Sequence, residues 1–80
     1  MLPTPELIKN TITAGLACSH LEVEVEGDGR HFSAVIVSDA FSGKRLIQRH
    51  RLVYAALGDR MREEIHALSM QTLTPEEFQK

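Results

Sequence analysis

Residue types that define several common protein classes are scarce in this chain. A single cysteine, Cys18, excludes an intrachain disulfide framework and a zinc site built from cysteines alone. Tryptophan is absent and only four rings of Phe and Tyr are present, so few side chains are available to stack on nucleobases. No apolar run approaches the roughly 20 residues that a membrane-spanning helix needs. The start of the sequence also lacks the regions of a secretory signal, and we therefore expect a cytoplasmic protein without a membrane partner.

The common catalytic motifs are missing as well. There is no G-x-x-x-x-G-K-[ST] loop, no H-E-x-x-H pair and no G-x-S-x-G elbow. The segment Gly27-Asp28-Gly29 lacks the third glycine and the strand-to-helix setting of a dinucleotide-binding loop. The carboxylates of residues 22, 24 and 26 alternate onto one solvent-exposed face of a strand. Nothing there excludes water, so a pair tuned for acid–base catalysis is not expected. We therefore expect a protein that is not an enzyme.

The residues that are present describe one small soluble domain over 1–80. Apolar residues make up 42% of the chain and charged residues 25%, which argues against disorder. Apolar spacing and turn signals predict the order α-β-β-α-β-α. The expected elements are a helix over 5–17 capped by Thr4, strands over 21–26 and 31–38, a helix over 45–62, a strand over 65–73 and a terminal helical turn from 75.

Connection lengths predict how these strands pair. The Gly27–Gly29 turn joins the first two strands as an antiparallel hairpin, whereas a helix joins the second and third, which should therefore run parallel. The second strand then lies in the middle of a three-stranded mixed sheet, with both long helices on one face. We expect an α+β fold, with the long helix ending or kinking at Gly58.

Two of the four histidines are predicted to share one end of the sheet. His31 begins the second strand and His66 the third, and parallel neighbours begin at the same end with backbones about 4.8 Å apart. Two neutral imidazoles suit zinc, copper or iron but are too few to hold an ion alone. The alternatives are a solvated His31 beside a turn and a core His66, on the same strand face as Leu68 and Met70.

The other candidate ligands are expected elsewhere. Cys18 and His20 should lie at the opposite end, as a half-buried small hydrophobe and a surface residue respectively. His50 lies within the apolar arc of the long helix and is expected to be a packed histidine with a hydrogen-bonding partner. On a helical wheel this arc contains Leu46, His50, Val53, Tyr54, Leu57 and Met61.

The opposite arc of the same helix is cationic. Lys44, Arg45, Arg49 and Arg51 fall within eight residues and offer phosphate contacts near a helix N-terminus. The alternative is a solvated helix face, because the whole chain carries a net charge of −2.

Several motifs, in order, resemble those of the BolA family, most closely its short, histidine-type bacterial branch. They are Val37-Ser-Asp-Ala-Phe-Ser-Gly-Lys44, Gln48-Arg-His-Arg-Leu-Val-Tyr54, Ile65-His-Ala-Leu-Ser69 and Thr72-Leu-Thr-Pro-Glu-Glu77. The resemblance implies an α-β-β-α-β-α fold like the class II KH domain, which agrees with the order read from the pattern. One departure is Phe78, which stands where the family commonly has tryptophan.

The same resemblance implies a non-enzymatic partner of a monothiol glutaredoxin, sharing a bridging 2Fe–2S cluster. The glutaredoxin and glutathione would each give a thiolate, and this chain His66 together with His31, the candidate in the loop between the first two strands. The isolated chain, a monomer or weak dimer, should bind no cluster tightly. The alternative function is a KH-like regulator that binds DNA through Lys44, Arg45, Arg49 and Arg51.

Overall fold

The chain folds into the predicted sequence of elements. The computed structural model describes residues 4–25, 31–64 and 67–79. In order, its elements are α1 (Pro5–Gly15), β1 (His20–Val25), β2 (His31–Val37), the 3-10 helix η1 (Asp39–Phe41), α2 (Leu46–Glu64), β3 (Ala67–Leu73) and α3 (Pro75–Gln79). The α+β class is confirmed. The expected turn at Gly27–Gly29 lies outside the described residues.

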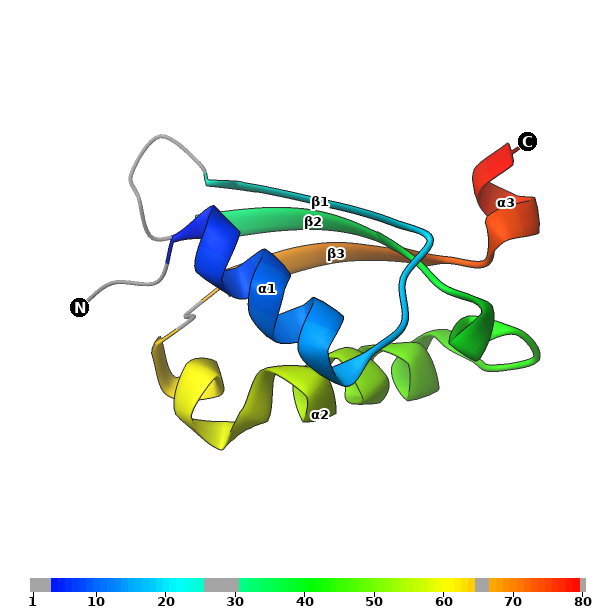
Figure 1. Ribbon diagram of the computed structural model, residues 1–80. Coiled ribbons are helices and arrows are strands. Elements are labelled where there is room, and N and C mark those ends of the chain that lie inside the picture. The colour runs from blue at the N-terminus through cyan, green and yellow to red at the C-terminus, as the bar shows by residue number, and fades with distance from the viewer. Residues whose placement is uncertain (1–3, 26–30, 65–66, 80) are drawn as a thin grey trace.

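The three strands form one mixed sheet in the order β1-β2-β3. β1 runs antiparallel to β2, and β3 runs parallel to β2, as the lengths of the connections predict. Helices α1 and α2 lie on one face of the sheet, and α3 lies beyond the end of β3 (Figure 1). The opposite face, which we call the open face, is not covered by the two long helices.

Side-chain alternation along β2 builds the core between the sheet and the long helices. Phe32, Ala34 and Ile36 are buried on the helix-covered face, where they join Ile8 and Ile12 of α1. Ile8 and Ile12 are four residues apart and therefore lie on the same face of α1. The helix begins after Thr4, whose Oγ1 accepts a hydrogen bond of 3.1 Å from the Leu7 N–H. The N-cap prediction is therefore confirmed.

The apolar arc of α2 enters this core only in part. Val53 and Leu57 are buried, but Leu46 is 63% exposed and the adjacent Ile47 is 60% exposed. Leu46 lies on the apolar arc of the helical wheel, but it does not join the core. A helical wheel gives the direction of a side chain but not the place where the underlying sheet ends.

Glycines shape both long helices. Gly58 has φ of 81° and ψ of 161°, a conformation open almost only to glycine, and it interrupts α2 as predicted. At Gly15, a Cβ atom would lie 2.9 Å from the Cα and Cβ atoms of Ala56, so α1 and α2 approach as closely as their backbones allow. Across the described part of the chain, we find no helix with both the length and the apolar character to cross a bilayer.

Ser38 ties the end of β2 to three other segments. It is 1% exposed, its Oγ donates to the Ala17 carbonyl at 2.6 Å, and the same oxygen accepts from the Ala40 N–H at 3.1 Å. Its backbone N–H donates to the Leu73 carbonyl at 2.9 Å. A buried hydroxyl with these partners costs little to desolvate and fixes the chain as it leaves the sheet.

The Gly15–Ala56 contact yields a test of this packing. We expect Gly15→Ala to lower the free energy of unfolding by about 1–3 kcal/mol, since the new methyl group forces the helices apart. Alanine's better helix propensity opposes this loss without removing it. Urea denaturation measures the difference, with Asn10→Ala on the exposed face of α1 as a control that should stay within about 0.5 kcal/mol of the parent. An unchanged or raised stability of Gly15→Ala would contradict the contact.

Candidate functional site

His31 lies at one end of the sheet, at the start of β2. Its Cα partner across the parallel ladder is Ala67, the first residue of β3. His31 is exposed, and alternation places it on the open face with Ser33 and Val35. His66, the other predicted ligand, lies outside the described residues and precedes Ala67 in the sequence. The structure therefore brings His31 to the predicted rim of the sheet, and the shared site stays a prediction.

The opposite end of the sheet holds His20, as predicted from the antiparallel pairing. His20 pairs with Val37, the last residue of β2. Its Nε2 lies 3.4 Å from a carboxylate oxygen of Glu22, and its ring stacks on Phe78 with centroids 4.6 Å apart and planes at 26°. The His20 side chain is 35% exposed, in keeping with the expected surface residue, but its stacking on Phe78 was not predicted. Sequence reasoning missed this contact because α3 folds back across the sheet end.

Cys18 lies at the same end as His20 and behaves as a small apolar residue. Burial raises the pKa of its thiol, and the S–H group lies 3.4 Å from the Leu16 carbonyl. A raised thiol pKa disfavours the thiolate, which is the form that ligates metals and attacks electrophiles. The interpretation of Cys18 as a half-buried hydrophobe is confirmed.

His50 is half-buried on α2, in keeping with a packed histidine. Its Nε2 atom is buried and has no hydrogen-bond partner among the described residues. The expected partner is therefore missing at this nitrogen.

The predicted cationic cluster does not stay together. Lys44, Arg45 and Arg51 are exposed, whereas the Arg49 side chain is only 14% exposed. Arg49 turns toward the end of β3, where its Nη1 donates to the Thr72 carbonyl at 2.8 Å. The expectation that Arg49 lies with the other three cations is wrong, because backbone and carboxylate acceptors at the end of the sheet engage its donors.

Glu77 is the carboxylate partner of Arg49, and the two join α2 to α3. Arg49 Nη1 lies 2.7 Å from Glu77 Oε1, and the same oxygen accepts a hydrogen bond of 2.8 Å from the Thr74 N–H. The Glu77 N–H donates in return to Thr74 Oγ1 at 3.2 Å, which completes a capping box at the start of α3. Arg49, followed by the Thr74 N–H, holds the pKa of the Glu77 carboxyl below its usual value. We call this arrangement the Arg49–Glu77 clasp.

The backbone at the start of α2 is also partly engaged. The Arg45 N–H donates to Gln48 Oε1 at 2.8 Å, so this amide is satisfied within the chain. An anion at the helix N-terminus would have to displace the glutamine side chain. Phosphate contacts in this region therefore depend on the exposed side chains of Lys44, Arg45 and Arg51.

The described residues do not form a closed metal site. Residues 4–25, 31–64 and 67–79 contain no group of three or more His, Cys, Asp or Glu side chains able to hold an ion. His31 contributes one exposed imidazole at the rim of the sheet. One imidazole is too few to hold an ion alone.

Comparison with known proteins defines the class to which this fold and these motifs belong. The profile of the BolA-like protein family matches residues 12–77, so the chain belongs to that family. Protein BOLA2 of Arabidopsis thaliana is 44% identical over 78 residues, covering 94% of this chain and 83% of that protein. The DNA-binding transcriptional regulator BolA of Escherichia coli is 40% identical over 53 residues, covering 66% of this chain and 50% of the regulator.

Solved structures agree with this assignment. A BolA protein homologue from Coxiella burnetii is 46% identical, has a TM-score of 0.78 and covers 99% of this chain and 100% of its own. The BolA fold is therefore the fold of this chain, as the motifs predicted.

The Arg49–Glu77 clasp predicts a localised change on substitution. Arg49→Gln should lower the free energy of unfolding by about 1–3 kcal/mol, because the carbonyl of the buried Thr72 loses its charged guanidinium donor. Amide hydrogen exchange in α3 should accelerate at neutral pH. The exposed Arg51→Gln variant is the matched control and should change neither quantity.

A pH series separates the Arg49–Glu77 contact from a general loss of packing. A lowered carboxyl pKa stabilises the folded state above the usual value of 4.5, and this contribution disappears as the pH falls through the folded-state pKa. The difference between the parent and Arg49→Gln in α3 exchange should therefore shrink below pH 4.5. A difference that stays constant with pH would show that the carboxylate takes no part.

Proposed function

We propose that this chain is a non-enzymatic adaptor that shares a bridging 2Fe–2S cluster with a monothiol glutaredoxin and glutathione. The single observation that carries the proposal is the pairing of His31 with Ala67, the residue that follows His66 in the sequence. Membership of the BolA-like family supports it, since this resemblance led us to expect such a partner. The cluster is cargo in iron–sulfur assembly or iron regulation, not a resident cofactor.

The chemistry of the donors favours a shared cluster. Cluster irons take thiolate or imidazole ligands, and imidazole ligation raises the reduction potential because a neutral nitrogen replaces a charged sulfur. The described thiol, Cys18, lies at the far end of the sheet from His31 and its pKa is raised, so thiolates must come from other molecules. A glutaredoxin cysteine and a glutathione thiolate supply them in this proposal, and His31 and His66 complete the set.

Substitution of the two histidines tests the proposal. Co-expression with a monothiol glutaredoxin should give a coloured heterodimer, and His66→Ala or His31→Ala should remove or shift its visible absorption bands. The reason is that each change deletes an iron ligand. His66→Cys and His31→Cys should restore a cluster with a shifted spectrum, since thiolate also binds iron.

His20→Ala is the matched control, because His20 lies at the opposite end of the sheet. It should leave the absorption bands unchanged. If His66→Ala and His20→Ala complexes gave the same spectrum as the parent, the ligand assignment would fail. If only His31→Ala were silent, His66 would stand and the second ligand would lie elsewhere.

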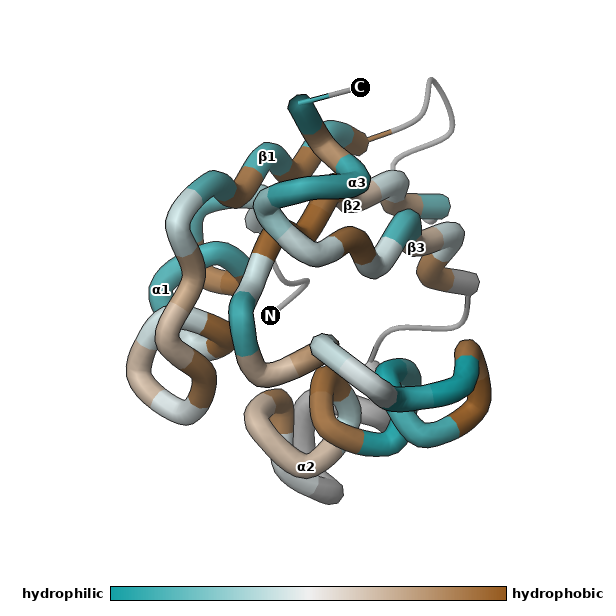
Figure 2. The backbone as a smooth tube through the Cα atoms, turned by 90° about the vertical axis from the view of Figure 1, so that its right-hand side faces the viewer, coloured by the Kyte–Doolittle hydropathy of each residue, from teal (hydrophilic) through white to brown (hydrophobic). Residues whose placement is uncertain are grey.

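A second function, DNA binding, is favoured by the three exposed cations at the start of α2. Relatives named DNA-binding transcriptional regulator BolA match this chain at 40–43% identity. Lys44, Arg45 and Arg51 are exposed at the start and along the first turns of α2, toward the end of the sheet opposite His31. Figure 2 views the molecule from this end, with α2 below the sheet and α3 above it.

A salt titration of binding to duplex DNA measures these contacts. Each phosphate contact contributes about −0.9 to the slope of log K against log salt, so Lys44→Ala, Arg45→Ala and Arg51→Ala should each weaken the slope by about 1. Lys9→Ala, an exposed cation on α1, is the control and should leave the slope unchanged. Absence of binding at low salt would exclude this function for the α2 cations.

A further inference from the structure

Strand β3 is an edge strand whose outward backbone groups can be identified. The Leu73 carbonyl accepts the Ser38 N–H, so Leu73 faces β2. The N–H and C=O groups of successive residues point alternately toward and away from the neighbouring strand. The groups of Thr72, Met70 and Leu68 therefore point away from β2. The Arg49 guanidinium on the Thr72 carbonyl agrees with this direction. Leu68 and Met70 thus present their N–H and C=O groups along the outer edge of β3.

The two edges of the sheet differ in charge. β1 carries Glu22 and Glu24, both exposed, and such charges discourage pairing with another strand. β3, over Ala67–Leu73, contains no charged residue and no proline. Two β3 edges can therefore approach without like-charge repulsion, whereas two β1 edges cannot.

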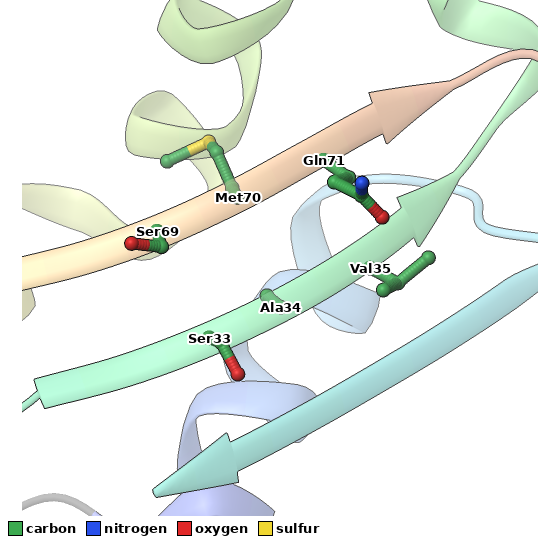
Figure 3. A pocket seen from close by; sticks show the side chains of 6 residues that line it. All are labelled: Ser33, Ala34, Val35, Ser69, Met70 and Gln71. Carbon is green, nitrogen blue, oxygen red and sulfur yellow. The ribbon is translucent and has the colours of Figure 1, made fainter. Parts of the chain in front are cut away.

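The side chains of β3 also favour pairing with β3 of a second copy of the chain. Leu68 and Met70 are half-buried and pack against the core, while Ser69 and Gln71 are exposed on the open face. Ser69, Met70 and Gln71 of β3, together with residues 33–35 of β2, line an open groove of about 270 Å³ that lies over the two paired strands (Figure 3). An incoming β3 would cover apolar side chains on one face and meet hydroxyl and amide groups on the other.

We propose that two copies of this chain associate through antiparallel pairing of their β3 edges, with the two-fold axis at Ser69. Leu68 of one copy then pairs with Met70 of the second copy, and Met70 with Leu68. Each of these pairs forms two N–H···O=C bonds, and the three-stranded sheets join into one continuous sheet. The interaction goes beyond the cluster and DNA-binding functions and depends on neither.

Arg49 selects this register over its neighbour. A two-fold axis at Met70 would place Leu68 of the second copy opposite Thr72, whose carbonyl is already bound by Arg49. The Leu68 N–H would then have to share the Thr72 carbonyl oxygen with the Arg49 guanidinium. With the axis at Ser69, every outward group of Leu68 and Met70 is paired and the Arg49–Glu77 clasp stays intact.

The register makes Ser69 the residue that faces its own copy. In Ser69→Lys or Ser69→Glu, identical charges stand directly opposite each other and should prevent pairing. An equimolar mixture of the two variants should pair, because lysine then faces glutamate. Gln71→Lys is the matched control on the same strand face, since position 71 faces position 67 of the second copy, and it should dimerise like the parent.

Sedimentation velocity from about 10 μM to about 1 mM, a range that spans weak association, measures these outcomes. The parent and Gln71→Lys should rise from 9.0 kDa toward twice that mass, the single Ser69 variants should stay at 9.0 kDa, and their mixture should rise again. Hydrogen exchange at the Leu68 and Met70 amides should slow with concentration in the parent and in Gln71→Lys, but not in either single Ser69 variant. Circular dichroism checks that the exposed Ser69 tolerates both changes.

Three results would overturn the proposal. One is a parent that stays at 9.0 kDa throughout the range. Another is equal disruption by Ser69→Lys and Gln71→Lys, which would place the contact elsewhere. The third is a mixture of Ser69→Lys and Ser69→Glu that remains monomeric, which would exclude a two-fold axis at Ser69.

Discussion

The parallel ladder between β2 and β3 is the interaction that places the start of β2, with His31, beside the start of β3. It sets His31 opposite Ala67 at one end and Val37 opposite Leu73 at the other. The two strands run the same way, so their connection has to return along the length of the sheet, and α2 does so on one face. The open face and the free edge of β3 both follow from this pairing. The same pairing leaves His31 at one end of the sheet and His20 at the other.

Much of this arrangement was accessible from the sequence because its signals are local. Thr4 and the Thr74–Glu77 capping box mark helix starts through contacts within one turn, and Gly58 interrupts α2 through its own backbone conformation. Strand directions follow from whether a turn or a helix joins two strands. These features depend on neighbours in sequence, and sequence patterns report such neighbours well.

The features that could not be predicted join residues far apart in the chain. Arg49 carries the same charge as Arg51, yet it is held at the end of β3 by acceptors more than twenty residues away. His20 meets Phe78 because α3 returns to the end of the sheet. Leu46 continues an apolar stripe past the place where the core ends. For the histidine site, the place of His31 at the rim of the sheet was predictable from topology, whereas His66, the other predicted ligand, lies outside the described residues.

The two helical ends of the domain lie at opposite ends of the sheet. Helix α1 begins toward the His31 end, and α3 lies at the far end, beside the stacked rings of His20 and Phe78 (Figure 1). A fluorophore, affinity handle or surface tether fused beyond Gln79 therefore leaves the His31 rim facing solution, whereas one fused ahead of Thr4 crowds it. A molecule immobilised by its carboxyl terminus thus keeps the His31 end of the sheet away from the support.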